Sequence, residues 1–191
     1  GMILSSKILE STKLIDAQFS MFADDYNIGI WSTVIFYSGT FECMAKMHLL
    51  NKDQLILGEP VFVQLHLEKP ACLLTNDKFI IRNSSNTISL GGGEILDVAP
   101  LHHRKRTPKL ISNLQNLANS VLNSADLFGI INYEVHKKAQ PIFVNELAES
   151  LGQSFSIIIN EIQKHNTGSI HVFGCTDKSI VISEDMHKKY Y

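Results

Sequence analysis

Two histidines and three basic residues follow one another just after the middle of the chain. His102 and His103 precede Arg104, Lys105 and Arg106. Guanidinium and ammonium groups bind phosphate oxygens, so this run is suited to contact a nucleic-acid backbone. The same composition is also typical of a solvated connector between two folded units. The sequence leaves both interpretations open.

Catalytic and nucleotide-binding motifs are missing from the sequence. The run Gly91–Gly93 is followed by Glu94 rather than by the Gly-Lys-Ser/Thr end of a phosphate-binding loop. Strand-like residues flank this run, so we expect a bulge or a tight crossing of strands there. The segment Asn51–Gln54 has the residue types of a guanine-specificity motif, but its Asp comes one place too early. We therefore expect a chain that is not an enzyme and has no catalytic residues.

The cysteines indicate a reducing compartment. Cys43, Cys72 and Cys175 are odd in number and widely spaced, and no Cys-x-x-Cys pair occurs. This usage fits reduced thiols better than disulfides or a zinc site, so we expect no metal ligands. No apolar run reaches the length of a membrane span, and the first residues lack the basic start of a signal peptide. The sequence predicts a cytoplasmic protein with no membrane partner.

Charge differs between the two halves of the chain. Residues 1–100 contain seven Lys/Arg and eleven Asp/Glu, whereas residues 101–191 contain ten and eight, with six of the eight His. The isoelectric point is near 6.5. A protein of this charge does not coat nucleic acid by charge alone, so any contact with RNA or DNA must use a local basic patch.

The first hundred residues have the pattern of short β-strands. Apolar, β-branched and aromatic residues alternate in several segments that are separated by polar turns. The predicted strands are 14–22, 33–37, 41–49, 61–67, 78–82, 87–90 and 94–97. The connections are short enough for hairpins, which predicts an antiparallel β-barrel over residues 1–100.

After Pro100 the apolar residues change to helical spacing. Two helices are expected between residues 110 and 135. Asn145 is a candidate N-cap for a third helix that ends at Gly152, and Ser154 is a candidate cap for a fourth. A hairpin of 170–173 and 179–182 follows, with its turn at 174–177. We therefore predict a basic linker over 101–109 and an α+β winged-helix domain over 110–191.

A winged helix raises the possibility of DNA binding, but the expected recognition helix is short of cations. It supplies Lys164 and His165 together with Glu161, and the wing supplies Lys178 beside Asp177. Phosphate contacts dominate the affinity of such domains for DNA. On these residues, a packing or protein-contact role is as well supported as nucleic-acid binding.

Several segments of the first half, taken in order, resemble a known family. They are Ser38–Glu42, Leu49–Leu50, Leu57–Pro70, Asn76–Arg82 and Thr87–Asp97. The series is similar to the third domain of the selenocysteine-specific elongation factor, SelB, whose closing pattern is R…T-I-G-G-G-x-V-L-D. Two departures occur: Ser89-Leu90 stand between Ile88 and the glycines, and Tyr37 replaces a common His. A basic linker and a winged helix also follow this domain in the family.

The resemblance implies contacts with tRNA. In the related elongation factor Tu, the third domain touches the T stem of aminoacyl-tRNA, partly through the loop before the last strand. The matching loop here is Asn83, Ser84, Ser85 and Asn86, preceded by Arg82. Small polar residues suit phosphate and 2′-hydroxyl contacts, although they are equally typical of an ordinary turn. The candidate RNA-binding residues are these five together with Arg104, Lys105 and Arg106.

The resemblance also implies a role for the whole chain. We expect a carboxy-terminal fragment of a SelB-like factor, with selenocysteinyl-tRNA as its partner and with the selenoprotein mRNA hairpin and the ribosome as further ones. The family's GTPase domain has no counterpart in the sequence, so GTP and Mg²⁺ are expected only for that missing domain and no cofactor for this chain. The winged helix would be a spacer or an RNA-binding module. The alternative is a winged-helix transcriptional regulator that binds DNA and has an amino-terminal β sensing domain.

Overall fold

The chain divides into two compact units, Gly1–Ala118 and Asn119–Tyr191, called here the barrel unit and the winged-helix unit. The computed structural model describes residues 10–24, 26–124, 126–138, 140–165, 168–174 and 178–190. Cys175 and most of the predicted wing turn lie outside the described residues, as do the first residues of the chain. None of the described helices has the length and apolar composition that a membrane span requires.

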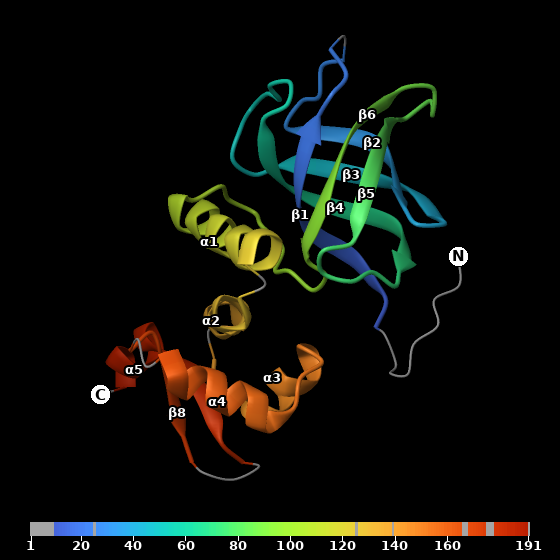
Figure 1. The fold of residues 1–191 in the computed structure, drawn as a ribbon. Helices are drawn as coiled ribbons and strands as arrows, with labels where there is room; N and C mark the ends of the chain where they lie inside the picture. Colours follow the sequence, from blue (N-terminus) through green and yellow to red (C-terminus); the bar gives the residue numbers. More distant parts are fainter. Residues whose placement is uncertain are drawn as a thin grey trace. The chain divides into compact units, whose positions relative to one another are not determined.

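Six antiparallel strands form a closed barrel in the order β1-β4-β3-β2-β5-β6 (Figure 1). Their bounds are β1 Thr12–Met21, β2 Trp31–Ser38, β3 Phe41–Leu49, β4 Pro60–Ala71, β5 Lys78–Asn83 and β6 Ser89–Asp97. The antiparallel barrel predicted from the sequence is therefore confirmed. The segments 87–90 and 94–97, predicted as separate strands, belong mainly to the single strand β6, which runs through the three glycines.

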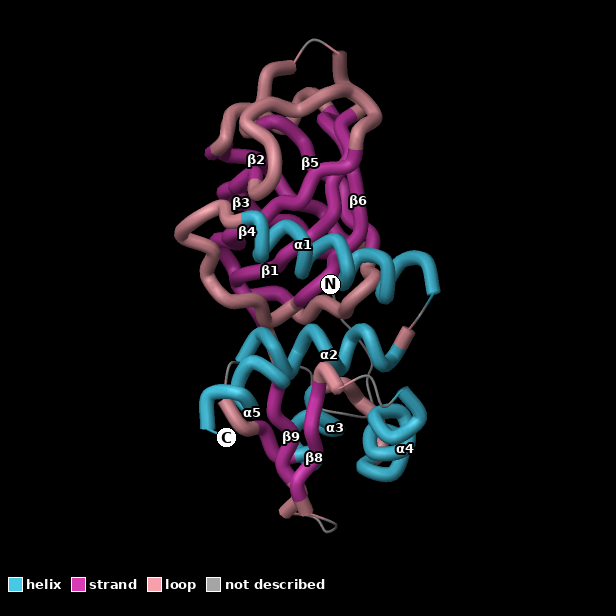
Figure 2. The backbone as a smooth tube through the Cα atoms, turned by 90° about the vertical axis from the view of Figure 1, so that its left-hand side faces the viewer, coloured by secondary structure: helices cyan, strands magenta, loops and turns pink. Residues whose placement is uncertain are grey.

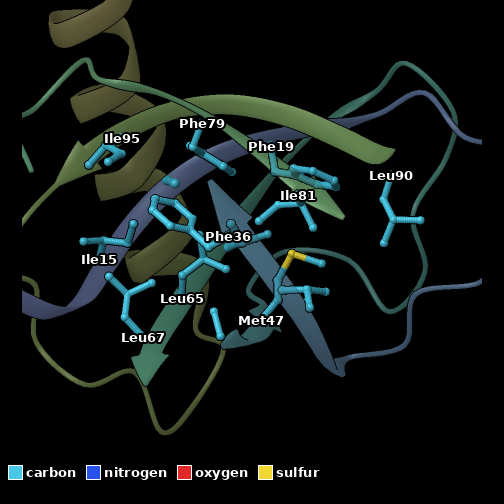
Figure 3. Close-up of a cluster of buried hydrophobic side chains, with 14 of the residues drawn as sticks. Ile15, Phe19, Phe36, Met47, Leu65, Leu67, Phe79, Ile81, Leu90 and Ile95 are labelled. Atoms are coloured by element: carbon cyan, nitrogen blue, oxygen red, sulfur yellow. The ribbon is translucent and has the colours of Figure 1, made fainter. Parts of the chain in front are cut away.

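Alternation of buried and exposed side chains explains why these segments form a barrel. On β3, Cys43, Ala45 and Met47 are buried, whereas Met44 and Lys46 between them are exposed. Successive side chains of a strand point to opposite faces, so one face of each strand can line a common core. Figure 3 shows this core, which several strands supply with large apolar side chains.

The glycines of β6 allow two strands to approach closely. An added Cβ at Gly93 would lie 1.8 Å from the backbone oxygen of Gln18, and one at Gly91 would lie 2.3 Å from that of Ser20. Both neighbours belong to β1, with which β6 pairs. This geometry agrees with the tight strand crossing expected from the sequence, and it requires residues without a Cβ.

The helix α1 (Pro108–Ala118) belongs to the barrel unit, whereas the sequence analysis assigned residues 110–191 to the second domain. Pro108 stands at the first helical position, where its missing N–H has no intrahelical partner to lose. Leu114, Leu117 and Ala118 are its buried residues. A π-helical turn, Asn119–Ser124, follows directly. The helical spacing was thus predicted correctly, but the spacing alone did not show which unit the helix joins.

The second unit has the predicted α+β winged-helix arrangement (Figure 2). Its elements are α2 Leu127–Lys138, β7 Ile142–Phe143, α3 Val144–Ser150, α4 Phe155–His165, β8 Ile170–Phe173, β9 Ile180–Ser183 and α5 Glu184–Tyr190. The three strands form one sheet in the order β7-β9-β8. Apolar residues of α2, α3 and α4 pack with those of this sheet to form a separate core. The helix α5 has no counterpart in the sequence prediction.

Two helix starts in this unit test the predicted caps. Asn145 lies inside α3, and the N-cap is Phe143, which makes no side-chain cap hydrogen bond. The prediction of Asn145 as the cap was therefore wrong, because β7 leads directly into α3 and the buried Val144 begins the helix. Ser154 does cap α4, since its Oγ accepts a hydrogen bond from the N–H of Ile157 at 3.4 Å.

Candidate nucleic-acid interface

The segment that follows β6 is fastened to the barrel by a buried polar network. Asp16 on β1 lies opposite Gln64 on β4. Gln64 donates hydrogen bonds from Nε2 to Asp16 Oδ1 at 2.8 Å and to the Leu101 carbonyl at 2.9 Å. Its Oε1 accepts from the His103 N–H at 3.1 Å, and His103 Nε2 lies 2.6 Å from Asp16 Oδ2. Residues 101–103 are thus held against the barrel rather than free in solvent.

Asp16, like Gln64, has no exposed surface. Burial raises the pKa of its carboxyl above the usual value, although the hydrogen bonds from His103 and Gln64 act in the opposite direction. The side chain of His103 is only 12% exposed. A buried carboxyl needs such partners, because an unpaired charge in this position would be strongly unfavourable.

The three basic residues after His103 differ in their surroundings. Arg106 forms an ion pair with Asp53 and donates a hydrogen bond from Nη1 to the Lys52 carbonyl at 2.9 Å. Arg104 and Lys105 are exposed. The expected solvated connector over 101–109 is therefore only partly correct, since both His103 and Arg106 bond to the barrel. Arg104 and Lys105 remain well placed to meet a phosphate.

The predicted RNA-binding loop between β5 and β6 is an ordered turn. Asn83 is buried, and its Oδ1 accepts hydrogen bonds from the N–H groups of Thr87 at 2.8 Å and Ile88 at 3.1 Å. Asn83 therefore holds the turn and does not face solvent. Ser84 is exposed, and so is the hydrogen bond between Ser85 Oγ and Thr87 Oγ1 at 3.0 Å.

The other end of this turn is held from β2. Asn86 has a left-handed backbone, with φ of +58°. Its Oδ1 accepts a hydrogen bond from the hydroxyl of Tyr37 at 3.0 Å. Arg82, which precedes the turn, donates from Nη2 to the Thr87 carbonyl at 3.4 Å. Tyr37, where the family commonly has His, thus helps to set the shape of the candidate loop.

A cluster of aromatic rings lies on the outer side of β2, β3 and β4. Trp31 stacks on His48 with ring centroids 4.1 Å apart and planes 4° apart. His66 lies 5.4 Å from Trp31 and 5.1 Å from His102, again between centroids. Trp31 is 51% exposed. Lys46 on β3 lies opposite His66 and adds a positive charge near the cluster. A half-exposed indole in such surroundings is suited to stack on a base or a ribose.

The sequence analysis did not find this ring cluster. Trp31, His48 and His66 come from three strands, and only the strand register brings them together: Trp31 lies opposite His48, and the neighbouring Lys46 lies opposite His66. Alternation within β3 and β4 could have placed the two histidines on the outer face, but the pairing of the strands was not predictable. Burial lowers the pKa of His48 and of His66.

The winged-helix unit offers few cations on α4, the helix that the sequence analysis expects to be its recognition helix. Lys164 is exposed at the end of α4, and its Nζ lies 3.9 Å from Glu161 Oε1. His165 also bonds to Glu161, at 3.0 Å. The exposed face of α4 includes the apolar Ile157. This agrees with the sequence-based interpretation that α4 is poorly equipped for a phosphate backbone.

Comparison with known families identifies the barrel. Residues 16–102 match the model of the selenocysteine-specific elongation factor, beta-barrel domain. The comparisons give no match to a GTPase domain in this chain. Comparison with curated proteins gives no match. The matched residues begin at Asp16, inside β1, and end at His102. They cover most of β1, all of β2 to β6, and Leu101 and His102 of the docked segment, which is the stretch 101–103 held by Gln64 and Asp16. Residues 16–102 therefore form a SelB β-barrel domain.

Proposed function

We propose that this chain is part of a selenocysteine-specific elongation factor and that its barrel unit contacts selenocysteinyl-tRNA. The observation that carries this proposal is the family match over residues 16–102, which covers nearly all of the closed six-stranded barrel. In this proposal the chain itself has no catalytic step, and GTP and Mg²⁺ belong to the GTPase domain of the complete factor. The compartment is the cytoplasm, where translation takes place.

Two surfaces of the barrel unit have suitable chemistry for RNA. The ordered turn presents Ser84 and Ser85 between the fixed residues Asn83 and Asn86. Hydroxyl and backbone groups held in this way can bond to phosphate oxygens and 2′-hydroxyls, which is how double-stranded RNA is recognised by shape. The exposed Arg104 and Lys105 can add electrostatic contacts with phosphates.

In this proposal the winged-helix unit is a spacer or a weak RNA-binding module. Its cation-poor α4 supports the spacer role over direct binding of the selenoprotein mRNA hairpin. A regulator that binds DNA through α4 would need more phosphate contacts than Lys164 and Lys178 supply.

Binding of the full chain to RNA tests the proposal. Affinity would be measured by fluorescence anisotropy for a tRNA with a long acceptor branch and for a DNA duplex of equal charge, at several salt concentrations. We expect a preference for the tRNA. The double variant Arg104→Ser/Lys105→Ser should weaken binding mostly at low salt and reduce the slope of log affinity against log salt by about one to two.

Two further variants locate the contact. Ser84→Glu/Ser85→Glu should weaken tRNA binding at least tenfold, because carboxylates in the turn repel phosphates and the fold is left intact. Lys164→Ser/Lys178→Ser is the matched control, since it removes two cations from the other unit and should leave tRNA binding unchanged. Equal affinity for the DNA duplex, lost in the control and kept in the loop variant, would refute the proposal and favour a DNA-binding regulator.

A further inference from the structure

Three side chains with metal-binding atoms converge in the winged-helix unit. They are His171 on β8 and Glu184 and His187 on α5, and their candidate ligand atoms all lie within 4.8 Å of one another. All three side chains are half-buried. This group lies within a single unit and plays no part in the proposed contact with tRNA.

The backbone brings these residues together. His171 lies opposite Ile182 in the β8–β9 pair, and α5 begins immediately after β9 (Figure 2). The N–H of Glu184 donates a hydrogen bond to the Ser169 carbonyl at 2.9 Å, which fixes the start of α5 beside β8. Glu184 and His187 are three residues apart, so they share one face of the helix.

The side chains already contact one another. His171 Nε2 bonds to Glu184 Oε2, and the rings of His171 and His187 stack with centroids 4.3 Å apart and planes 23° apart. The second oxygen of Glu184, Oε1, lies 3.0 Å from Lys188 Nζ. Glu184 Oε2 can therefore bind an ion together with the two histidines, while Oε1 keeps its ion pair with Lys188.

We propose that His171, Glu184 and His187 bind a divalent transition-metal ion, with Zn²⁺ as the best fit. Two imidazole nitrogens and one carboxylate oxygen are a donor set that Zn²⁺ favours, with water in a fourth position. Mg²⁺ and Ca²⁺ prefer sites built from oxygen. Binding requires the stacked rings of His171 and His187 to turn edge-on to the ion by rotation about their side-chain torsions, which also alters the stacking of His187 on Phe173. The ion would join the start of α5 to β8.

A second cluster provides a comparison within the same unit. The candidate ligand atoms of Asp126, Glu161 and His165 also lie within 4.8 Å of one another. This set has one nitrogen and two oxygens, so it is less suited to Zn²⁺. Substitution of His165 therefore serves as the matched control for substitution of His171 or His187.

Titration of the full chain with Co²⁺ and Zn²⁺ tests the proposal. Co²⁺ in a tetrahedral site gives visible absorption bands, and Zn²⁺ should displace it with a stoichiometry of one ion per chain. We expect His171→Ala and His187→Ala each to weaken binding at least tenfold, and His165→Ala to leave it unchanged. Excess Mg²⁺ should not compete. Zn²⁺ should raise the melting temperature of the unmodified chain and not that of His187→Ala.

Other outcomes would refute the site. Loss of binding in His165→Ala alone would assign the ion to the other cluster. Strong thiolate-to-cobalt charge-transfer bands would assign the ion to a cysteine and would also refute the site. Should His171→Ala fail to fold, Glu184→Gln and His187→Ala on α5 provide the same test, and unchanged binding in both would overturn the proposal.

Discussion

Asp16 and His103 lie 87 positions apart in the sequence, and their side chains meet at 2.6 Å on the barrel. Gln64 bonds to the same carboxyl and to the backbone of the docked segment at two points. These bonds hold the exit of β6 in place and so determine where Arg104 and Lys105 emerge. The position of the basic residues therefore depends on a buried carboxyl of the first strand.

Substitution of Gln64 tests this anchoring. Gln64→Ala leaves Asp16 Oδ1 and two backbone groups without their partner, and an unsatisfied buried polar group costs about 1–3 kcal/mol. We expect a loss of about 2 kcal/mol in the free energy of urea unfolding. Trypsin should also cut faster after Arg104 and Lys105, because residues 101–103 are released. Gln54→Ala, at an exposed position, is the control and should change neither result.

The close approach of β1 and β6 predicts a severe effect at Gly93. Gly93→Ala would place a methyl group 1.8 Å from the backbone oxygen of Gln18, and a strand backbone cannot move aside cheaply. We expect a loss of more than about 3 kcal/mol in unfolding free energy, or failure to fold. Gly29→Ala adds the same methyl group where nothing lies within 4 Å. Unfolding of both variants would be followed by circular dichroism. Similar losses of unfolding free energy in the two variants would contradict the close approach of β1 and β6.

The histidines of the ring cluster predict a loss of barrel stability in acid. Burial lowers the pKa values of His48 and His66 below 6.5, so the unfolded chain binds protons more readily than the folded one. Their contribution to stability is therefore complete above about pH 6.5 and is lost as the pH falls toward the folded pKa values. The double variant His48→Phe/His66→Phe should flatten the pH dependence of the urea midpoint between pH 7 and 5.

Trp31→Phe is the control for that measurement. It perturbs the stacked cluster but keeps both histidines, so it should retain the pH dependence of the unmodified chain. A double variant as sensitive to acid as the unmodified chain would show that other groups cause the acid effect.

The hydrogen bond between Tyr37 and Asn86 predicts a coupling between β2 and the candidate RNA-binding loop. Tyr37→Phe removes the hydroxyl that donates to Asn86 Oδ1, which should cost about 1 kcal/mol in unfolding free energy. If the turn contacts tRNA, looser positioning of Ser84 and Ser85 should also weaken tRNA binding several-fold. Tyr26→Phe changes a half-buried tyrosine outside this turn and should leave tRNA binding intact.

Local patterns in the sequence determined most of the secondary structure and the fold class. The alternation of Cys43, Ala45 and Met47 with exposed neighbours predicts a strand because side chains on a strand alternate between faces. The change to helical spacing after Pro100, and the cap at Ser154, predict helices for equally local reasons. The family resemblance likewise depended on residues read in order. These features involve neighbours in the chain, so they can be read without a structure.

Only the tertiary structure determined which distant residues meet. Asp16, Gln64 and His103 become partners because β1 and β4 pair in one particular register and the chain after β6 returns across them. The same reason applies to the Trp31 cluster and to the convergence of His171 with α5. It also explains the assignment of α1 to the barrel unit, since an apolar helical face fits any complementary surface. Closure of the barrel, which no local pattern encodes, selects the contacts of Asp16 and Trp31, and the pairing of β8 with β9 selects those of His171.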